Sequence, residues 1–311
     1  MPTDIISDLI ARIDSDRLSE ALFHIAKDPL PFRKLNHTRP GSDKNTLYEA
    51  DDYLQQNLEA CGYVVSREGV QVQAFRCDAS KPKSHQYARP EPDDPWYTAY
   101  NLYAERQGCA HPGEIVLFIA HKDSQSWVDS PGAYDNAVGT VAVLEIARVL
   151  KDYAPERTLR FLFCNEEHTP WTSVIAAQQA VERGDNLVGI FNIDSLGGKS
   201  QEDIDAGRKT NVTLYTEPEG ERFADLMAAV NTAYGIGLIQ RKVKRDRPGD
   251  DDGSFIKAGF PIAVANLGSC PYADPAYHRE DDAPDRVDLP NVVMATQLSL
   301  AAGLRVDLGI V

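Results

Sequence analysis

Four short runs of almost uninterrupted apolar residues stand out in the chain after residue 110. These runs are Ile115–Ala120, Thr158–Cys164, Leu187–Ile193 and Pro261–Leu267. Such runs are typical of strands buried on both faces, as in a sheet with many parallel strands. Segments with apolar residues at helical spacing separate or follow them, at Ala137–Tyr153, about Thr172–Arg183, Glu221–Tyr234 and Leu289–Leu304. The alternation predicts an α/β fold with a mostly parallel or mixed central sheet and helices on both of its faces.

The N-terminal part of the chain has a less regular pattern. Its expected elements are one or two short amphipathic helices within residues 4–27, a connector over 28–45, a helix over Thr46–Cys61, a pair of strands over Val64–Phe75 and a polar, proline-rich loop over 77–96. No linker divides the chain into two separate patterns. We therefore expect a single domain over residues 1–311.

The composition narrows the classes of partner. The 311 residues include 32 Lys and Arg against 47 Asp and Glu, which gives a formal net charge of −15. This acidic balance argues against nucleic acid and against an anionic membrane surface, because both require clustered Lys and Arg. The longest apolar run, Ile115–Ala120, is far shorter than the roughly 20 residues of a membrane-spanning helix. An apolar fraction of 42% is enough for a sizeable core.

The N-terminus and the cysteines bear on the compartment. Residues 1–16 alternate apolar and acidic positions, without the basic start and apolar stretch of a secretory signal. Five scattered cysteines without CxxC spacing favour free thiols in a reducing compartment. We therefore expect a cytoplasmic protein, although a secreted form whose signal has been removed stays open. The sequence does not indicate an oligomeric state.

Residues that can bind metal or move protons follow the apolar runs. They are His121 after the first run, Glu166 and Glu167 after the second, Asp194 after the third, Tyr277 and His278 beyond the fourth, and Asp135 just before the helix near Ala137. In open α/β sheets, ligands bind beyond the carboxyl ends of the strands. We therefore expect these side chains to meet at one edge of the sheet.

The donor set suits borderline divalent metals, zinc first, because it contains two imidazoles and three carboxylates. Two ions about 3.5–4 Å apart, bridged by one carboxylate, would hold a water and a substrate carbonyl. One member of the Glu166–Glu167 pair is then left to move protons. Each residue alone has an ordinary explanation, such as a helix N-cap for Asp135 or a surface position for His278. Five such residues at one sheet edge favour a metal site.

Five motifs also occur in a fixed order. They are Ala120-His121-Lys122-Asp123-Ser124, Pro131-Gly132-Ala133-Tyr134-Asp135-Asn136-Ala137-Val138-Gly139, Glu166-Glu167, Asn192-Ile193-Asp194 and Tyr277-His278. This order resembles the M28 family of zinc metallopeptidases. The resemblance covers about residues 45–305 and implies a three-layer α/β/α catalytic core of the zinc exopeptidase type. Residues 1–44 would then be an N-terminal helical extension.

The resemblance implies a ligand for each of two zinc ions. His121 and Asp194 would hold one ion, Glu167 and His278 would hold the other, and Asp135 would bridge them. The implied activity is that of an aminopeptidase, which hydrolyses peptides or other small amides with a metal-activated water.

Three further roles follow from the same resemblance. Glu166 would be the general base that activates the water and returns a proton to the leaving amine. Asp123 would accept a hydrogen bond from the His121 ring and fix its tautomer. Tyr277 matches a tyrosine that stabilises the tetrahedral oxyanion in some members.

Several residues near the expected pocket depart from the family pattern. Asn165 replaces a small residue before the glutamates, His168-Thr169-Pro170-Trp171 replaces a glycine-containing run, Tyr134 replaces a frequent Asp, and Asp252 stands where His is expected. None of these departures removes a ligand. The roles of His168, Trp171 and Asp252 stay open.

Two other functions compete with the peptidase. A glutaminyl-cyclase-like acyltransferase on a related scaffold would use a single zinc ion, so a set of five ligands favours the peptidase. A catalytically inactive binding module on the same fold is disfavoured by the retention of Glu166 beside the ligands. The preferred terminal residue and the metal used in the cell cannot be deduced from the sequence.

Overall fold

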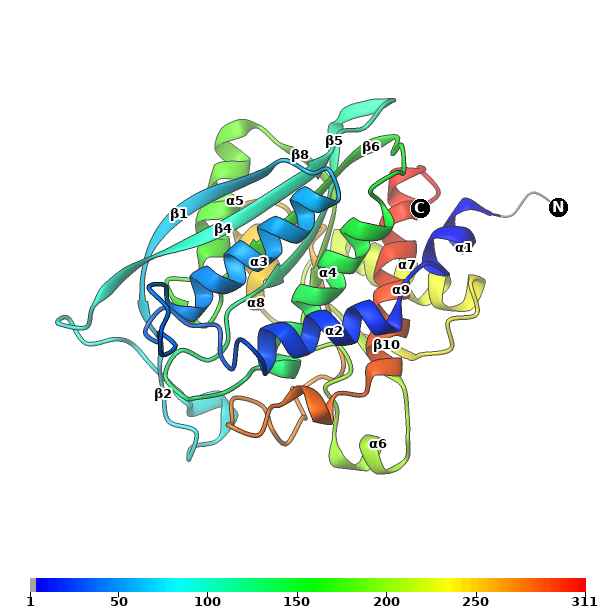
Figure 1. The fold of residues 1–311 in the computed structure, drawn as a ribbon. Helices are drawn as coiled ribbons and strands as arrows, with labels where there is room; N and C mark the ends of the chain where they lie inside the picture. Colours follow the sequence, from blue (N-terminus) through cyan, green and yellow to red (C-terminus); the bar gives the residue numbers. More distant parts are fainter. Residues whose placement is uncertain (1–3) are drawn as a thin grey trace.

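The computed structural model describes residues 4–311, except for the side chain of Ser84. The strands of its main sheet are β1 (Val65–Ala74), β4 (Trp96–Arg106), β5 (His111–His121), β6 (Arg157–Cys164), β7 (His168–Thr169), β8 (Asn186–Ile193), β9 (Thr210–Tyr215), β10 (Ile239–Lys244) and β11 (Val264–Leu267). They follow the order β10-β9-β11-β8-β5-β6-β4-β1-β7 across the sheet (Figure 1).

The middle of this sheet is parallel and its flanks are antiparallel. β5 pairs in parallel with β6 on one side and with β8 on the other, and β8 pairs in parallel with β11. β4 runs antiparallel to β6 and β1, and β9 runs antiparallel to β11. The expected α/β fold with a mixed sheet is confirmed. Because β5, β6, β8 and β11 point the same way, their carboxyl ends share one edge.

Helices cover both faces of the sheet. They are α1 (Ile5–Ile10), α2 (Ser15–Ala26), α3 (Thr46–Ala60), α4 (Val138–Val149), α5 (Thr172–Arg183), α6 (Gln201–Asp205), α7 (Pro218–Ala233), α8 (Asp250–Lys257) and α9 (Leu289–Asp307). Successive residues of β5 point to opposite faces, so that Phe118 packs in a cluster with residues of α4 and α9, and Leu117 packs with residues of α5 and α8. In Figure 1, α2, α3 and α4 lie together on one side of the sheet, and α5 lies on the other.

The N-terminal half of the sheet corrects two sequence expectations. Residues Val64–Phe75 do not form a pair of strands: β1 is one strand that pairs with β4, and Gly69 lies opposite Tyr100 instead of in a turn. Residues 77–96 are not a structureless loop either. They contain β3 (Tyr87–Ala88), which pairs with β2 (Arg76–Cys77).

The edge strand β10 has no apolar run that would mark it in the sequence. β10 lies at one end of the sheet order and is half-exposed or exposed along its whole length, so its sequence carries no apolar run.

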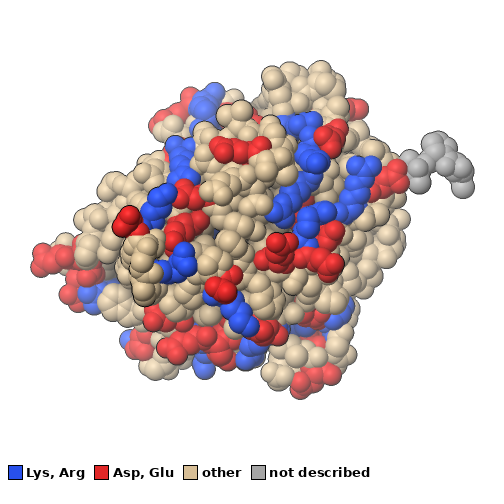
Figure 2. Space-filling model, in the orientation of Figure 1, with Lys and Arg blue, Asp and Glu red and all other residues tan. Residues whose placement is uncertain are grey.

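On the face seen in Figure 2, basic side chains lie close to acidic ones. Over residues 4–311, no helix is both long enough and apolar enough to cross a membrane.

A buried ion pair ties α3 to the carboxyl end of β5. Lys122, directly after β5, places Nζ 2.9 Å from Oδ1 of Asp51 on α3, and both side chains are fully buried. The same Nζ donates to Oδ1 of Asn165 at 2.8 Å. Burial raises the pKa of Asp51, and Lys122 opposes that rise. Without Lys122, the buried carboxylate of Asp51 would therefore lose the cation that favours its charged form.

We expect Lys122→Met to lower the free energy of unfolding by about 3–5 kcal/mol, because it leaves Asp51 buried without a cation. The double variant Lys122→Met/Asp51→Leu should recover much of that loss, since it removes both charges. Urea unfolding measures both. Lys44→Met, which breaks an exposed pair with Asp52, is the matched control and should cost about 0–1 kcal/mol. Equal losses in Lys122→Met and Lys44→Met would contradict this account.

Candidate metal centre

The candidate centre lies where the parallel strands end. β5 ends at His121, Glu166 and Glu167 follow β6 closely, and Asp194 directly follows β8. Because β6, β5 and β8 are neighbours in the sheet, their carboxyl ends bring these side chains to one edge.

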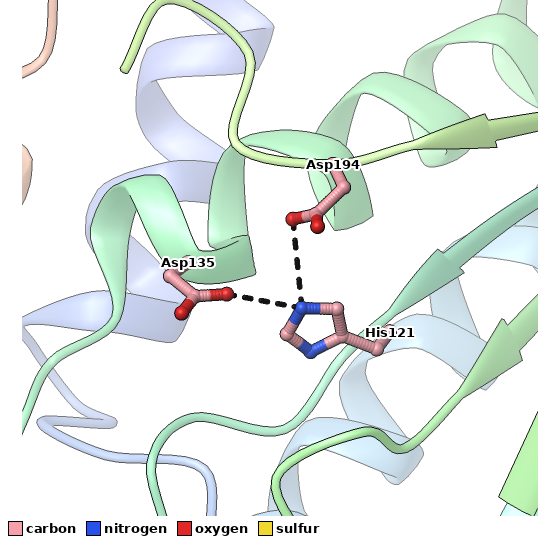
Figure 3. A group of neighbouring side chains, drawn as sticks. All are labelled: His121, Asp135 and Asp194. Atoms are coloured by element: carbon pink, nitrogen blue, oxygen red, sulfur yellow. Dashed lines mark ion pairs between the residues drawn. The ribbon is translucent and has the colours of Figure 1, made fainter. Parts of the chain in front are cut away.

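One group of three potential ligands is His121, Asp135 and Asp194. Nε2 of His121 lies 3.1 Å from Oδ1 of Asp135 and 3.6 Å from Oδ1 of Asp194. Figure 3 shows both carboxylates pointing at the same ring nitrogen. All three side chains are buried. Their donor atoms converge from the end of β5, the turn before α4 and the end of β8.

A second group is Asp135, Glu167 and His278. Nε2 of His278 lies 2.7 Å from Oδ2 of Asp135 and 3.0 Å from Oε1 of Glu167. Gln125 donates to Oε2 of Glu167 at 2.9 Å, which leaves Oε1 to face the histidine. Asp135 therefore belongs to both groups, with one carboxylate oxygen directed at each histidine.

The turn that carries Asp135 is held by two polar side chains. Asn136 donates to the carbonyl oxygen of Ile193 at 2.9 Å and accepts from the backbone N–H of Ser195 at 3.1 Å, on either side of Asp194. Asp282 accepts from the backbone N–H of Asp135 at 3.2 Å. These contacts fix Asp135 beside Asp194. A side chain at Gly139 would overlap with Asn136 and the Ile193 carbonyl, so the start of α4 needs glycine there.

Asp123 connects two of the potential ligands, His121 and Glu167, to their neighbours through four hydrogen bonds. Its Oδ1 accepts from Nδ1 of His121 at 3.2 Å and from the backbone N–H of Glu166 at 2.9 Å. Its Oδ2 accepts from the backbone N–H of Glu167 at 2.9 Å and from Nδ1 of His168 at 2.8 Å. Since a carboxylate only accepts, Nδ1 of His121 carries a proton, and Nε2 faces Asp135 and Asp194, where it could bind a metal.

Arg33 joins the loops that carry His121 and Asp135. It comes from the segment between α2 and α3 and is fully buried. Its guanidinium donates to the backbone carbonyls of Lys122 at 2.7 Å, Pro131 at 2.6 Å and Gly132 at 2.8 Å. Burial lowers the pKa of Arg33 to about 10, so it stays charged at neutral pH. A residue far from the ligands in sequence thus bridges their two loops.

The electrostatics of the centre favour cations. Asp135, Glu167 and Asp194 have side chains no more than 5% exposed, and among the described residues their ion pairs are with histidines. Burial alone would lower the pKa of His121, but its carboxylate neighbours raise that pKa well above the usual range. The pKa of His278 is raised in the same way, against burial, by Glu167 and Asp135. Buried carboxylates are costly without compensating charge, which divalent cations supply.

One unsatisfied oxygen also fits a bound ion. Oδ2 of Asp135 is buried and makes no hydrogen bond, although it lies only 2.7 Å from Nε2 of His278. Two potential ligand atoms this close, without a hydrogen bond between them, are suited to a shared metal ion. Imidazole nitrogens and carboxylate oxygens are donors that zinc accepts.

Comparison with known sequences identifies the family. Residues 101–302 match peptidase family M28. The chain belongs to this family. A probable zinc metalloprotease from Pyrenophora teres f. teres is 28% identical over 201 residues, covering 53% of this chain and 41% of that protein. Leucine aminopeptidase 1 from Phaeosphaeria nodorum is 26% identical over 200 residues, covering 60% of this chain and 51% of that protein. The matches thus span about half the length of these curated relatives.

Solved structures show that the fold extends over almost the whole chain. An aminopeptidase from Aneurinibacillus sp. strain AM-1 has a TM-score of 0.71 at 15% identity, covering 97% of this chain and 96% of that one. A glutaminyl cyclase from Bacteroides thetaiotaomicron has a TM-score of 0.69 at 19% identity, covering 94% and 97%. These likenesses establish a shared fold, and enzymes of two reaction classes have it.

Three residues that depart from the M28 motif, His168, Asp252 and Trp171, differ from one another in what they contact. His168 does not join either ligand group: Nδ1 donates to Asp123 and Nε2 accepts from the backbone N–H of Leu35 at 3.3 Å. Asp252 is buried and pairs with Arg245. Burial raises the pKa of Asp252 to about 7, and Arg245 opposes that rise. Trp171 is the N-cap residue of α5 and is half-buried.

Glu166 and Tyr277 directly precede Glu167 and His278, two members of the candidate ligand groups. Oε2 of Glu166 is buried and makes no hydrogen bond. Burial, with a further contribution from Asp251 and Asp250, raises the pKa of Glu166 well above its usual range. The Tyr277 ring stacks on the His278 ring with centroids 3.7 Å apart.

Two tyrosines that the sequence did not indicate contact the potential ligands. The Tyr272 hydroxyl donates to Oδ2 of Asp194 at 2.7 Å. The Tyr87 hydroxyl lies within 3.3 Å of both oxygens of Glu167. No motif marks either residue. Tyr87 also lies within the segment expected to be a structureless loop.

We expect Asp123→Asn to weaken zinc binding about 10- to 100-fold, as is typical when a group that orients metal ligands is lost. The amide can direct only one oxygen at donors, so its NH₂ group would oppose N–H groups of Glu167 and His168 or of His121 and Glu166. Competition with a chromophoric chelator measures the affinity. Asp129→Asn, at a mostly exposed carboxylate paired with Lys34, is the control. An unchanged affinity in Asp123→Asn would refute the role of Asp123.

Proposed function

We propose that this chain is a zinc-dependent aminopeptidase that binds two zinc ions and removes residues from the N-termini of peptides or other small amides. The observation that carries the proposal is the pair of buried ligand groups that share Asp135. His121 and Asp194 would hold one ion, Glu167 and His278 the other, and Asp135 would bridge them. Residues 45–305 would form the catalytic core of a single domain, and residues 1–44 an N-terminal extension.

Bound zinc would lower the pKa of a water and polarise the scissile carbonyl. The protein groups would carry out the proton transfers. Glu166 would take a proton from the water on its unpartnered Oε2 and return it to the nitrogen of the leaving group as the C–N bond breaks. The buried Oε2 of Glu166 supports this role, because it has no hydrogen bond to break before it accepts the proton.

Two other side chains would assist. Asp123, through His121 and the backbone of Glu166 and Glu167, would keep ligands and base in one arrangement. Tyr277 would donate a hydrogen bond to the oxyanion of the tetrahedral intermediate. Its stacking on His278 supports this, since the ring is held next to a proposed ligand.

The names of the relatives support the choice of metal and of reaction. One curated relative is a probable zinc metalloprotease and another is a leucine aminopeptidase. The second ligand group supports the peptidase over the cyclase-like alternative, which would need a single zinc ion. The excess of carboxylates would also attract the free α-amine of a peptide.

We expect Glu166→Gln to keep both zinc ions and to lower kcat at least 100-fold, because the amide cannot accept the water proton. Asp135→Ala should instead lose zinc, because both ligand groups need this carboxylate. Metal analysis by mass spectrometry and peptide turnover measure the two effects separately. Comparable activity in Glu166→Gln would refute its role as base, and two retained zinc ions in Asp135→Ala would refute the bridge.

The reaction itself is tested with a pool of mixed peptides, half of them blocked at the N-terminus. Zinc-loaded and metal-stripped protein are compared by mass spectrometry. We expect single residues to be lost from free N-termini only, and only with zinc. Shortening from the C-terminus would overturn the polarity of cleavage. Cyclised N-terminal Gln without cleavage would support the acyltransferase, and an unchanged pool would argue against a peptidase.

A further inference from the structure

A small hairpin brings Tyr87 to the second ligand group. We call residues 76–94 the cap. Its strands β2 and β3 pair so that Cys77 lies opposite Tyr87. The side chain of Arg76 pairs with Asp94 through two hydrogen bonds of 2.9 Å, which closes the base of the cap. The Tyr87 ring packs edge-on against Phe75, with centroids 4.4 Å apart.

The phenol oxygen of Tyr87 lies among the ligand atoms of this group. It is 2.8 Å from Nε2 of His278 and 3.1 Å from Nδ1. It is also 3.2 Å from Oε1 and 3.3 Å from Oε2 of Glu167. A tetrahedral zinc ion with bonds of about 2.0 Å separates its ligand atoms by about 3.3 Å. The distances from the phenol oxygen to Glu167 therefore match those of one more ligand. A short movement of the phenol away from Nδ1 of His278 would align it with an ion bound at Nε2.

Tyr87 also covers the group from the solvent side. Tyr87 as a residue is 38% exposed, whereas Glu167 and His278 are 3% and 1% exposed. A substrate that approaches Glu167 and His278 from the side of Tyr87 must first displace the phenol.

Two further contacts hold the cap over the loop that carries His278. Lys83 donates to the backbone carbonyls of Tyr272 at 2.9 Å and Asp274 at 2.7 Å. Gln86 lies with Oε1 3.1 Å from Nδ1 of His278 and can accept its proton. This contact directs Nε2 of His278 toward the metal position. The cap thus orients one ligand and supplies another potential one.

We propose that Tyr87 is a displaceable fourth protein ligand of the metal held by Asp135, Glu167 and His278. In the resting state the phenol oxygen would occupy the position that a substrate needs, and substrate binding would displace the phenol. This inference rests on the proposed function, because it assumes a metal at that group.

Copper(II) is the probe, because coordination by a phenolate gives visible charge-transfer absorption. Metal-stripped protein is reloaded with copper(II) and its spectrum is recorded. We expect the band in the unmodified chain and in Tyr272→Phe, and its loss in Tyr87→Phe. Tyr272→Phe is the matched control, because its hydroxyl contacts Asp194 in the other ligand group. Addition of an amino-acid hydroxamate, which competes for the metal, should bleach the band.

Zinc affinity and kinetics provide a second readout. Tyr87→Phe should bind the zinc ion of the group Asp135, Glu167 and His278 about 10-fold less tightly, and its KM at saturating zinc should fall several-fold, since no phenol competes with substrate.

The outcomes separate the two proposals. Bound metal without the band, or a band that survives in Tyr87→Phe, would overturn the role of Tyr87 and leave the aminopeptidase standing. A chain that binds no metal at all would overturn the proposed function.

Discussion

The fold buries several carboxylates at one edge of its sheet, and the structure depends on groups that offset the repulsion among them. Asp135, Glu167 and Asp194 meet there with almost no exposure to water. Bringing them together costs free energy, which only nearby positive charge or hydrogen-bond donors can offset. Much of the surrounding architecture serves this purpose, from the histidines between the carboxylates to the backbone N–H groups directed at Asp123.

The residues that organise this edge are mostly not among the potential metal ligands. Asn136, Asp282 and Asp123 each bind backbone N–H or C=O groups of the segments that carry the ligands. Polar side chains that clamp the backbone in this way fix several donor atoms at once. A change in one of them would displace a whole turn, which explains how a site assembled from separate loops keeps a defined geometry.

Much of the fold and the site could be predicted from local patterns. The buried run Ile115–Ala120 lies within β5, and the helix expected over Thr172–Arg183 is α5. The residues after the parallel strands were expected to meet because the fold class dictates a common edge. The sequence did not predict β10, because an exposed edge strand needs no apolar run. The roles of Tyr87 and Arg33 could not be predicted, because they come from contacts with residues far away in the sequence, which no local pattern records.

Arg33 links the N-terminal part of the chain to the loops of the candidate metal centre. Its guanidinium connects the segment between α2 and α3 to the loops around His121 and Asp135. Any local opening that releases the N-terminal segment would also strip these carbonyls of their donor and loosen the ligands. By linkage, an ion that binds only the assembled edge must then stabilise the docking of residues 28–45. Metal availability would thereby set how readily a protease can cut the chain near its beginning, a site with no contact to the ion itself.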